Sequence, residues 1–181
     1  MTGNTRSVKS GLEGVVDVGI IVVAHFRNPA RRHAAQLLQE ALMLKRRIIV
    51  PLSTYLGAYV IMTRYLKLRR NRVARALLET LSLESPAFYE NIPKTAAEKA
   101  IAVASELNLS SWDGYLIKLA RELEIARIYT IDEELTERVK EVEVVNPIPE
   151  NVMKEYHEFL EERLEKHRAQ RTPNQNPDSK T

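Results

Sequence analysis

Apolar residues recur along the chain in two alternating patterns. Short runs rich in Val and Ile predict buried strands, and longer stretches with apolar residues three and four positions apart predict amphipathic helices. The predicted strands are 15–17, 48–50, 86–92, 126–131 and 142–145, and the predicted helices are 29–44, 53–71, 73–81, 95–107, 110–123, 133–139 and 149–167. Strands that alternate with helices favour a parallel sheet joined by helical crossovers. The predicted fold class is therefore α/β, a three-layer α/β/α domain with a central, mostly parallel sheet and a C-terminal helix.

One carboxylate interrupts the most apolar stretch of the chain. Gly14 to Ala24 reads GVVDVGIIVVA, with Asp17 as its single charge. A carboxylate is expensive to bury among Val and Ile side chains unless it is paired or binds a metal. We therefore expect Val15–Asp17 to be the tail of a strand, with Gly19 letting the chain turn into a helix. The carboxyl ends of parallel strands open onto the ligand crevice, so Asp17 is interpreted as the floor of a site, with a plain turn or capping Asp as the alternative.

Three more residues follow the same logic, each with a structural alternative. Asp132 ends the strand RIYTID and should lie at the same sheet edge, although an Asp before Glu133 is also an ordinary helix N-cap. Asp113 stands in the first turn of the helix that Ser110 opens, where the helix dipole alone favours an acid. Thr130 lies on the same side of its strand as Asp132, where its hydroxyl either bonds a ligand or packs.

The order of these acids resembles the PIN-domain ribonucleases. The matching pieces are VVDVGIIVVA, IIVPLSTYLGAYVIM, SSWDGYLIKLARE and IYTIDEEL, and the resemblance covers roughly residues 14–147. It implies a PIN-like fold and a metal-dependent endoribonuclease that hydrolyses RNA phosphodiesters. Asp17, Asp113 and Asp132 would bind Mg²⁺ or Mn²⁺ and would act, with Thr130, as the catalytic residues. Carboxylates suit these hard ions, which lower the pKa of a bound water.

The resemblance also implies partners. Many PIN proteins are cytoplasmic toxins of toxin–antitoxin pairs and form homodimers, so an antitoxin or another protein partner and a homodimer are expected here. The chain departs from the family at Gly57, where the pattern has a glutamate, and no acid occurs between Glu40 and Glu79. Three carboxylates would hold a hydrated Mg²⁺ more weakly, and Glu133 is either a further ligand or a solvent-facing residue. The alternative function is a catalytically degenerate PIN-like module that binds RNA or a protein partner.

Basic residues bear on the substrate. A dense basic stretch and the residues that follow the Asp17 segment are candidates for phosphate contacts, namely Arg64, Lys67, Arg69, Arg70 and Arg72, together with Arg31 and Arg32. The alternative is a solvated helix–turn–helix corner, since the formal net charge is only +3. The four histidines show no metal-ligand spacing, which argues against a zinc site.

Composition narrows the function classes further. The chain of 181 residues has no cysteine, which excludes disulfides and thiolate chemistry. It shows neither a signal core nor a run long enough to span a membrane, so a cytoplasmic protein is expected. We expect a flexible leader at 1–13, one domain at 14–147, a C-terminal helix at 148–168 that packs on the domain or a partner, and a disordered tail at 169–181. A receiver-like domain fits least, because neither paired acids nor a phosphate-binding glycine loop is present.

Overall fold

A five-stranded sheet forms the centre of the computed structural model, which describes residues 11–169; expectations for 1–10 and 170–181 lie outside the described residues. All strand pairs are parallel, and the strand order is β3-β2-β1-β4-β5. The strands are β1 (Gly14–Val16), β2 (Ile48–Pro51), β3 (Phe88–Tyr89), β4 (Arg127–Tyr129) and β5 (Glu143–Val145). The predicted parallel sheet is confirmed, and β1 lies where the chain switches from one half of the sheet to the other.

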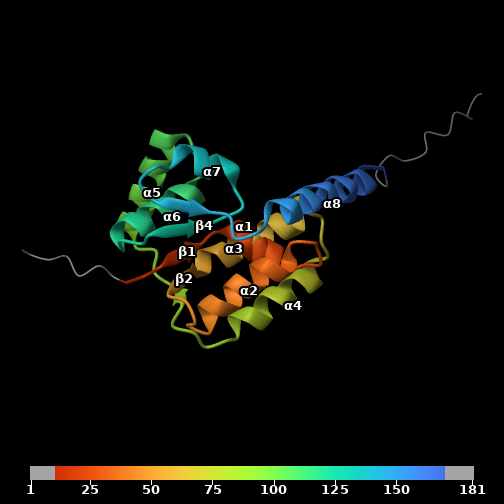
Figure 1. The fold of residues 1–181 in the computed structure, drawn as a ribbon, viewed down its shortest axis with the longest axis horizontal. Helices are drawn as coiled ribbons and strands as arrows, with labels where there is room; N and C mark the ends of the chain where they lie inside the picture. Colours follow the sequence, from red (N-terminus) through yellow and green to blue (C-terminus); the bar gives the residue numbers. More distant parts are fainter. Residues whose placement is uncertain (1–10, 170–181) are drawn as a thin grey trace, which may run out of the picture.

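Helices cover both faces of this sheet (Figure 1). They are α1 (Val18–Ala24), α2 (Arg31–Leu42), α3 (Leu52–Val60), the π-helical turn η1 (Ile61–Tyr65), α4 (Arg70–Leu81), α5 (Lys94–Leu107), α6 (Ser111–Glu122), α7 (Glu133–Arg138) and α8 (Glu150–Ala169). Figure 1 shows α2, α3 and α4 on one side of the strands and α5, α6 and α7 on the other, which is the predicted three-layer α/β/α arrangement.

The alternation of side chains along each strand divides the core between the two faces. Val16 packs into the apolar cluster of α1–α4 and α8, whereas its neighbour Val15 packs into the cluster of α5, α6 and α7. Ile48 and Ile49 separate in the same way. Successive strand residues point to opposite faces, so strands buried on both sides read as continuous apolar runs. This is why β1 and β2 are visible in the sequence as runs of Val and Ile.

The predicted continuous helix from 53 to 71 is wrong. The helix α3 runs into the π-helical turn η1, the chain leaves helical geometry after Leu66, and Lys67 adopts a left-handed φ of 53°. A new helix, α4, starts at Arg70. Met62, in the π-helical turn, and Leu66, directly after it, are both buried. Periodicity alone missed it because apolar residues continue at helical spacing across the break.

The starts of α3 and α1 have two further local features. Pro51 stands at the N-cap of α3, and the Thr54 hydroxyl donates to the carbonyl of Pro51 at 2.6 Å. Gly19 lies inside α1 rather than at a turn. A Cβ on Gly19 would lie 2.8 Å from Cγ1 of Ile131, so glycine is required there for the close approach of α1 to the end of β4.

The helix α8 packs against the domain through its first half. Met153 and Tyr156 are buried, and the ring of Phe26 contacts the rings of Tyr156 and Phe159 at centroid distances of 6.4 and 6.3 Å. Its second half continues outward past the sheet (Figure 1). Along residues 11–169, none of the helices combines the length and the apolar character needed to cross a bilayer.

Candidate active site

Parallel pairing brings Asp17 and Thr130 together from distant parts of the chain. Val16 of β1 is in register with Tyr129 of β4, and the backbone N–H of Asp17 donates to the Tyr129 carbonyl at 2.9 Å. Asp17 directly follows β1 and Thr130 directly follows β4, so the two residues lie side by side. The Thr130 hydroxyl donates to Oδ2 of Asp17 at 2.7 Å. The same Thr130 oxygen accepts the backbone N–H of Asp132 at 3.0 Å. One buried hydroxyl thus links the first predicted acid to the turn that carries the third.

Asp17 is an almost completely buried carboxylate, with 4% of its surface exposed. It caps α1 by accepting the backbone N–H groups of Val18 and Gly19. Burial raises the pKa of the Asp17 carboxyl to about 6, the negative charge of Asp113 adds to that rise, and the hydrogen bond from Thr130 opposes it. The ionised carboxylate is therefore held at a cost that a nearby cation would offset.

Asp113 is positioned by the start of α6. Ser110 and Asp113 form a capping box, in which the Ser110 hydroxyl and backbone N–H donate to Oδ2 of Asp113 at 2.7 and 3.2 Å. This confirms the helix start predicted from the sequence. Burial raises the pKa of the Asp113 carboxyl, and the charges of Asp132 and Glu134 raise it further. Asp113 therefore interacts electrostatically with both Asp17 and Asp132.

Asp132 differs from the other two acids because it is exposed. Its Oδ1 accepts the backbone N–H of Glu134 at 2.9 Å, so it is the N-cap of α7. Within residues 11–169, no group of three or more His, Cys, Asp or Glu side chains has the arrangement of a metal site. The pair of buried acids still suits Mg²⁺, which proteins hold through one or two carboxylates while it keeps several waters. The donor set on this edge of the sheet thus fits a hard divalent ion.

The position of Gly57 faces the same region. A Cβ built there would lie 3.0 Å from Cγ2 of Val18 and 3.9 Å from the Trp112 ring. Val18 follows Asp17 and Trp112 precedes Asp113, so a side chain at position 57 would start next to the sequence neighbours of the two buried acids. Glu134, which raises the pKa of Asp113, was not singled out from the sequence, where it reads only as an acid in the first turn of a helix.

The raised pKa of Asp17 predicts how the metal-free protein responds to pH. An unfolded Asp titrates near 3.8, so between there and about pH 6 the folded state binds more protons than the unfolded state. The free energy of unfolding should therefore fall as pH rises through this window. We expect the Tm of cation-free protein to drop more steeply between about pH 4 and pH 6 than that of an Asp17→Asn variant. Thermal unfolding followed by circular dichroism checks this, and parallel curves would contradict it.

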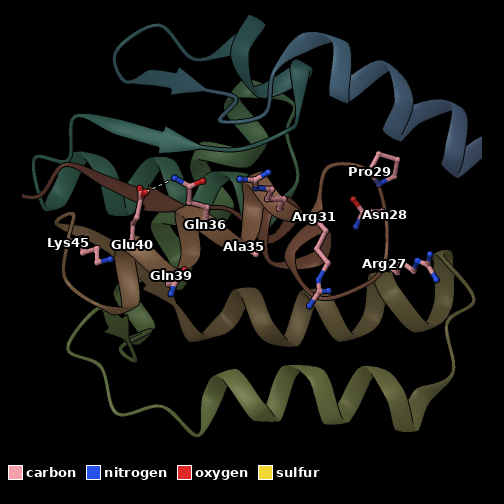
Figure 2. Close-up of a pocket in the computed structure, with 10 residues that line it drawn as sticks. Arg27, Asn28, Pro29, Arg31, Ala35, Gln36, Gln39, Glu40 and Lys45 are labelled. Atoms are coloured by element: carbon pink, nitrogen blue, oxygen red, sulfur yellow. Dashed lines mark hydrogen bonds between the residues drawn. The ribbon is translucent and has the colours of Figure 1, made fainter.

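The predicted nucleic-acid contacts fall on two cavities, neither of which is lined by Asp17, Asp113 or Asp132. Arg31 and Arg32 line a cavity of about 680 Å³ along α2, which Figure 2 shows between Arg27 and Lys45. A second cavity of about 540 Å³ is lined by Lys67, Arg69 and Arg72. The other two predicted residues, Arg64 and Arg70, are exposed and line neither cavity. The basic residues thus divide into two groups joined by Arg27, which lines both cavities.

Two solved structures with TM-scores above 0.5 support the fold. VapC20 of Mycobacterium tuberculosis, described as a toxin that cleaves the sarcin–ricin loop, superposes with a TM-score of 0.51 at 13% identity over 69% of this chain and 94% of its own. PAE2754 of Pyrobaculum aerophilum gives 0.52 at 15% identity over 91% and 99%. A toxin–antitoxin complex from Klebsiella pneumoniae gives 0.46 at 21% identity over 75% and 98%.

The family itself follows from the sequence. No curated protein matches the chain at a significant level. The model of the PIN domain family, however, matches residues 14–142, which contain all three predicted acids, the sheet from β1 to β4 and the helices between them. Because this match covers well over half of the 181 residues, the chain belongs to the PIN domain family.

Proposed function

We propose that this protein is a metal-dependent endoribonuclease of the toxin type. The observation that carries the proposal is the buried Asp17, bonded by Thr130 and electrostatically coupled to Asp113 at the carboxyl edge of the sheet. This edge lies beside β1 at the topological switch point, where open α/β sheets bind their ligands. Carboxylates with raised pKa values in such a place are typical of a functional site.

Asp17, Asp113 and Asp132 would hold a Mg²⁺ or Mn²⁺ ion. Such an ion lowers the pKa of a bound water and offsets the charge that builds on phosphate oxygens. The ion would also offset the repulsion among the acids, which raises the pKa values of Asp17 and Asp113. Binding of the ion should therefore release protons and stabilise the folded state.

The chain's own residues hold the acids in place. Thr130 acts as a positioning residue, because its hydroxyl donates to Asp17 and accepts the N–H of Asp132. Ser110 does the same for Asp113 by fixing its Oδ2. Each hydroxyl thus orients a carboxylate that burial would otherwise leave short of partners.

RNA is the proposed substrate, because predicted phosphate contacts line two cavities that carry several arginine and lysine residues. VapC20 is described as cleaving the sarcin–ricin loop, which is an activity on structured RNA. An antitoxin or other protein partner and a homodimer stay predictions from the family resemblance. The second candidate function is a degenerate module that binds RNA or protein without cutting, and it is favoured by the missing acid at Gly57, whose neighbours include the Trp112 ring.

Metal removal separates the two functions. Purified full-length protein should cleave labelled single-stranded RNA in Mn²⁺. Cleavage should stop in EDTA and should resume when excess Mn²⁺ is added. A contaminating metal-independent ribonuclease would survive EDTA. Gel-resolved products over time supply the measurement. Retained RNA binding without cleavage across several RNAs would contradict the nuclease and support the binding module.

A further inference from the structure

We propose that a basic cleft between the α3–α4 connection and α8 binds the phosphate backbone of single-stranded RNA. This inference rests on the proposed function and deepens it by giving α8 a role in substrate binding. The cleft is the cavity of about 540 Å³ described above. Its cationic residues are Arg27, Lys67, Arg69, Arg72 and Arg163, and the histidines His25 and His167 also line it.

Within the described chain, the positive charge in the basic cleft has no acidic partner on the walls of the cleft, and Glu162, which lines the adjoining cavity beside Arg163, pairs with Lys166. Among residues 11–169, no Asp or Glu lines it. Arg27, Lys67, Arg69 and Arg72 take part in none of the ion pairs between described residues. By contrast, arginines elsewhere on the fold, such as Arg46 and Arg121, are paired with glutamates. Neighbouring cations without counter-charges repel one another. A bound polyanion would neutralise these cations and be held by their positive charge.

The basic cleft has fixed walls. Nε of Arg163 on α8 donates to the carbonyl of Leu66 at 3.2 Å, which ties α8 to the chain just after the π-helical turn. Tyr156, two turns earlier on α8, is buried in the core. On the other wall, Val73 is buried and anchors the first turn of α4. Arg72 and Arg163 therefore stand on packed helices, so contacts with them would cost little ordering of the backbone, whereas Arg27, Lys67 and Arg69 lie on the segments that lead into α2 and α4.

The start of α4 adds to the positive field. Arg69 is its N-cap and no side chain caps this helix, while Arg70 and Arg72 stand in its first turn. A helix N-terminus carries partial positive charge and favours acids nearby, so cations in this turn are unfavourable by themselves. A bound phosphate would satisfy both the free N–H groups and the arginines.

A polymer explains the surface better than a single anion. Arg27 also lines the cavity along α2, where Arg31, Arg32 and Lys45 follow (Figure 2). The cations therefore form a track rather than one point. Arg27 comes shortly after α1, which begins beside Asp17 and, at seven residues, is about 10 Å long. One strand could lie in the basic cleft and still reach the acids.

Salt-dependent RNA binding tests the basic cleft. Fluorescence anisotropy would follow a labelled oligouridylate binding to full-length protein in EDTA, where the strand stays intact. We expect Arg72→Gln and Lys67→Gln each to weaken binding roughly fivefold at about 0.1 M salt and to lower the salt slope by about 0.7, the value for one lost phosphate contact on a single strand. Lys94→Gln on α5 is the matched control, because it removes the same charge from the opposite layer, and should change binding less than about twofold.

The outcomes separate the basic cleft from the nuclease. Equal weakening by Arg72→Gln and Lys94→Gln would overturn the cleft, because only net charge would then matter. Normal binding by Arg72→Gln in a protein that cleaves RNA would also overturn it and leave the nuclease intact. Cleft-dependent binding without cleavage in Mn²⁺ would keep the cleft and remove the nuclease. An acidic peptide that binds through Arg72 while RNA does not would overturn the RNA assignment.

Discussion

RNA cleavage is expected to fall at least about 10³-fold when Asp17 is replaced by Asn, a loss of about 4 kcal/mol of transition-state stabilisation. Asn keeps the shape and one of the two acceptor oxygens but removes the charge that would hold the divalent ion. Loss of outer-shell partners of metal ligands already costs 10–100-fold, so a direct ligand should cost more. Initial rates on labelled RNA in saturating Mn²⁺ would measure the effect.

The fold should survive this change. Asn is a good helix N-cap, so α1 keeps a side chain able to accept from Val18. Burial of an ionised Asp17 is costly at neutral pH, so the Tm of metal-free Asp17→Asn should be no lower than that of the wild type. Glu133→Gln is the control, because it removes an exposed acid next to Asp132 and should retain most activity. Equal RNA-cleavage rates for the wild type and Asp17→Asn would show that Asp17 has no role in catalysis.

Much of the fold was predictable because its elements are encoded locally. The continuous apolar strands, the capping box at Ser110 and the apolar face of α6 depend on residues close together in the chain. The break between α3 and α4 was not predictable from the sequence, because it depends on contacts with residues far away in the chain. The carbonyl of Leu66 accepts from Arg163, 97 residues further along, and Met62 packs in the core. Local spacing carries no information about such partners.

The candidate site shows the same division. The sequence placed Asp17, Asp113 and Asp132 near strand ends and helix starts, which are features of local pattern. The bond from Thr130 to Asp17 depends on the register of β1 against β4, across 113 residues. The unequal exposure of the acids also depends on the surrounding layers, since Asp17 and Asp113 are buried whereas Asp132 is exposed. Register and burial are set by packing, so neither followed from spacing.

Gly57→Glu is expected to tighten Mn²⁺ binding at least about tenfold, equivalent to about 1.4 kcal/mol. The new side chain would start next to Val18 and Trp112, the sequence neighbours of the two buried acids, and would add the charge that the family pattern has there. Its Cβ would lie 3.0 Å from a methyl group of Val18, which must yield by a few tenths of an ångström. Isothermal titration calorimetry with Mn²⁺ would measure the affinity directly.

Gly57→Gln is the matched control for this change. Gln shares the size of Glu, the strain against Val18 and the gain in helix propensity over glycine, so those effects cancel in the comparison. What remains is the charge. Without divalent ions, a fourth carboxylate adds to the repulsion around Asp17, so Gly57→Glu should then have a lower Tm than Gly57→Gln. In Mn²⁺ the order should reverse. If both variants bind Mn²⁺ equally, position 57 does not face the metal, and the missing glutamate does not explain any weakness of the site.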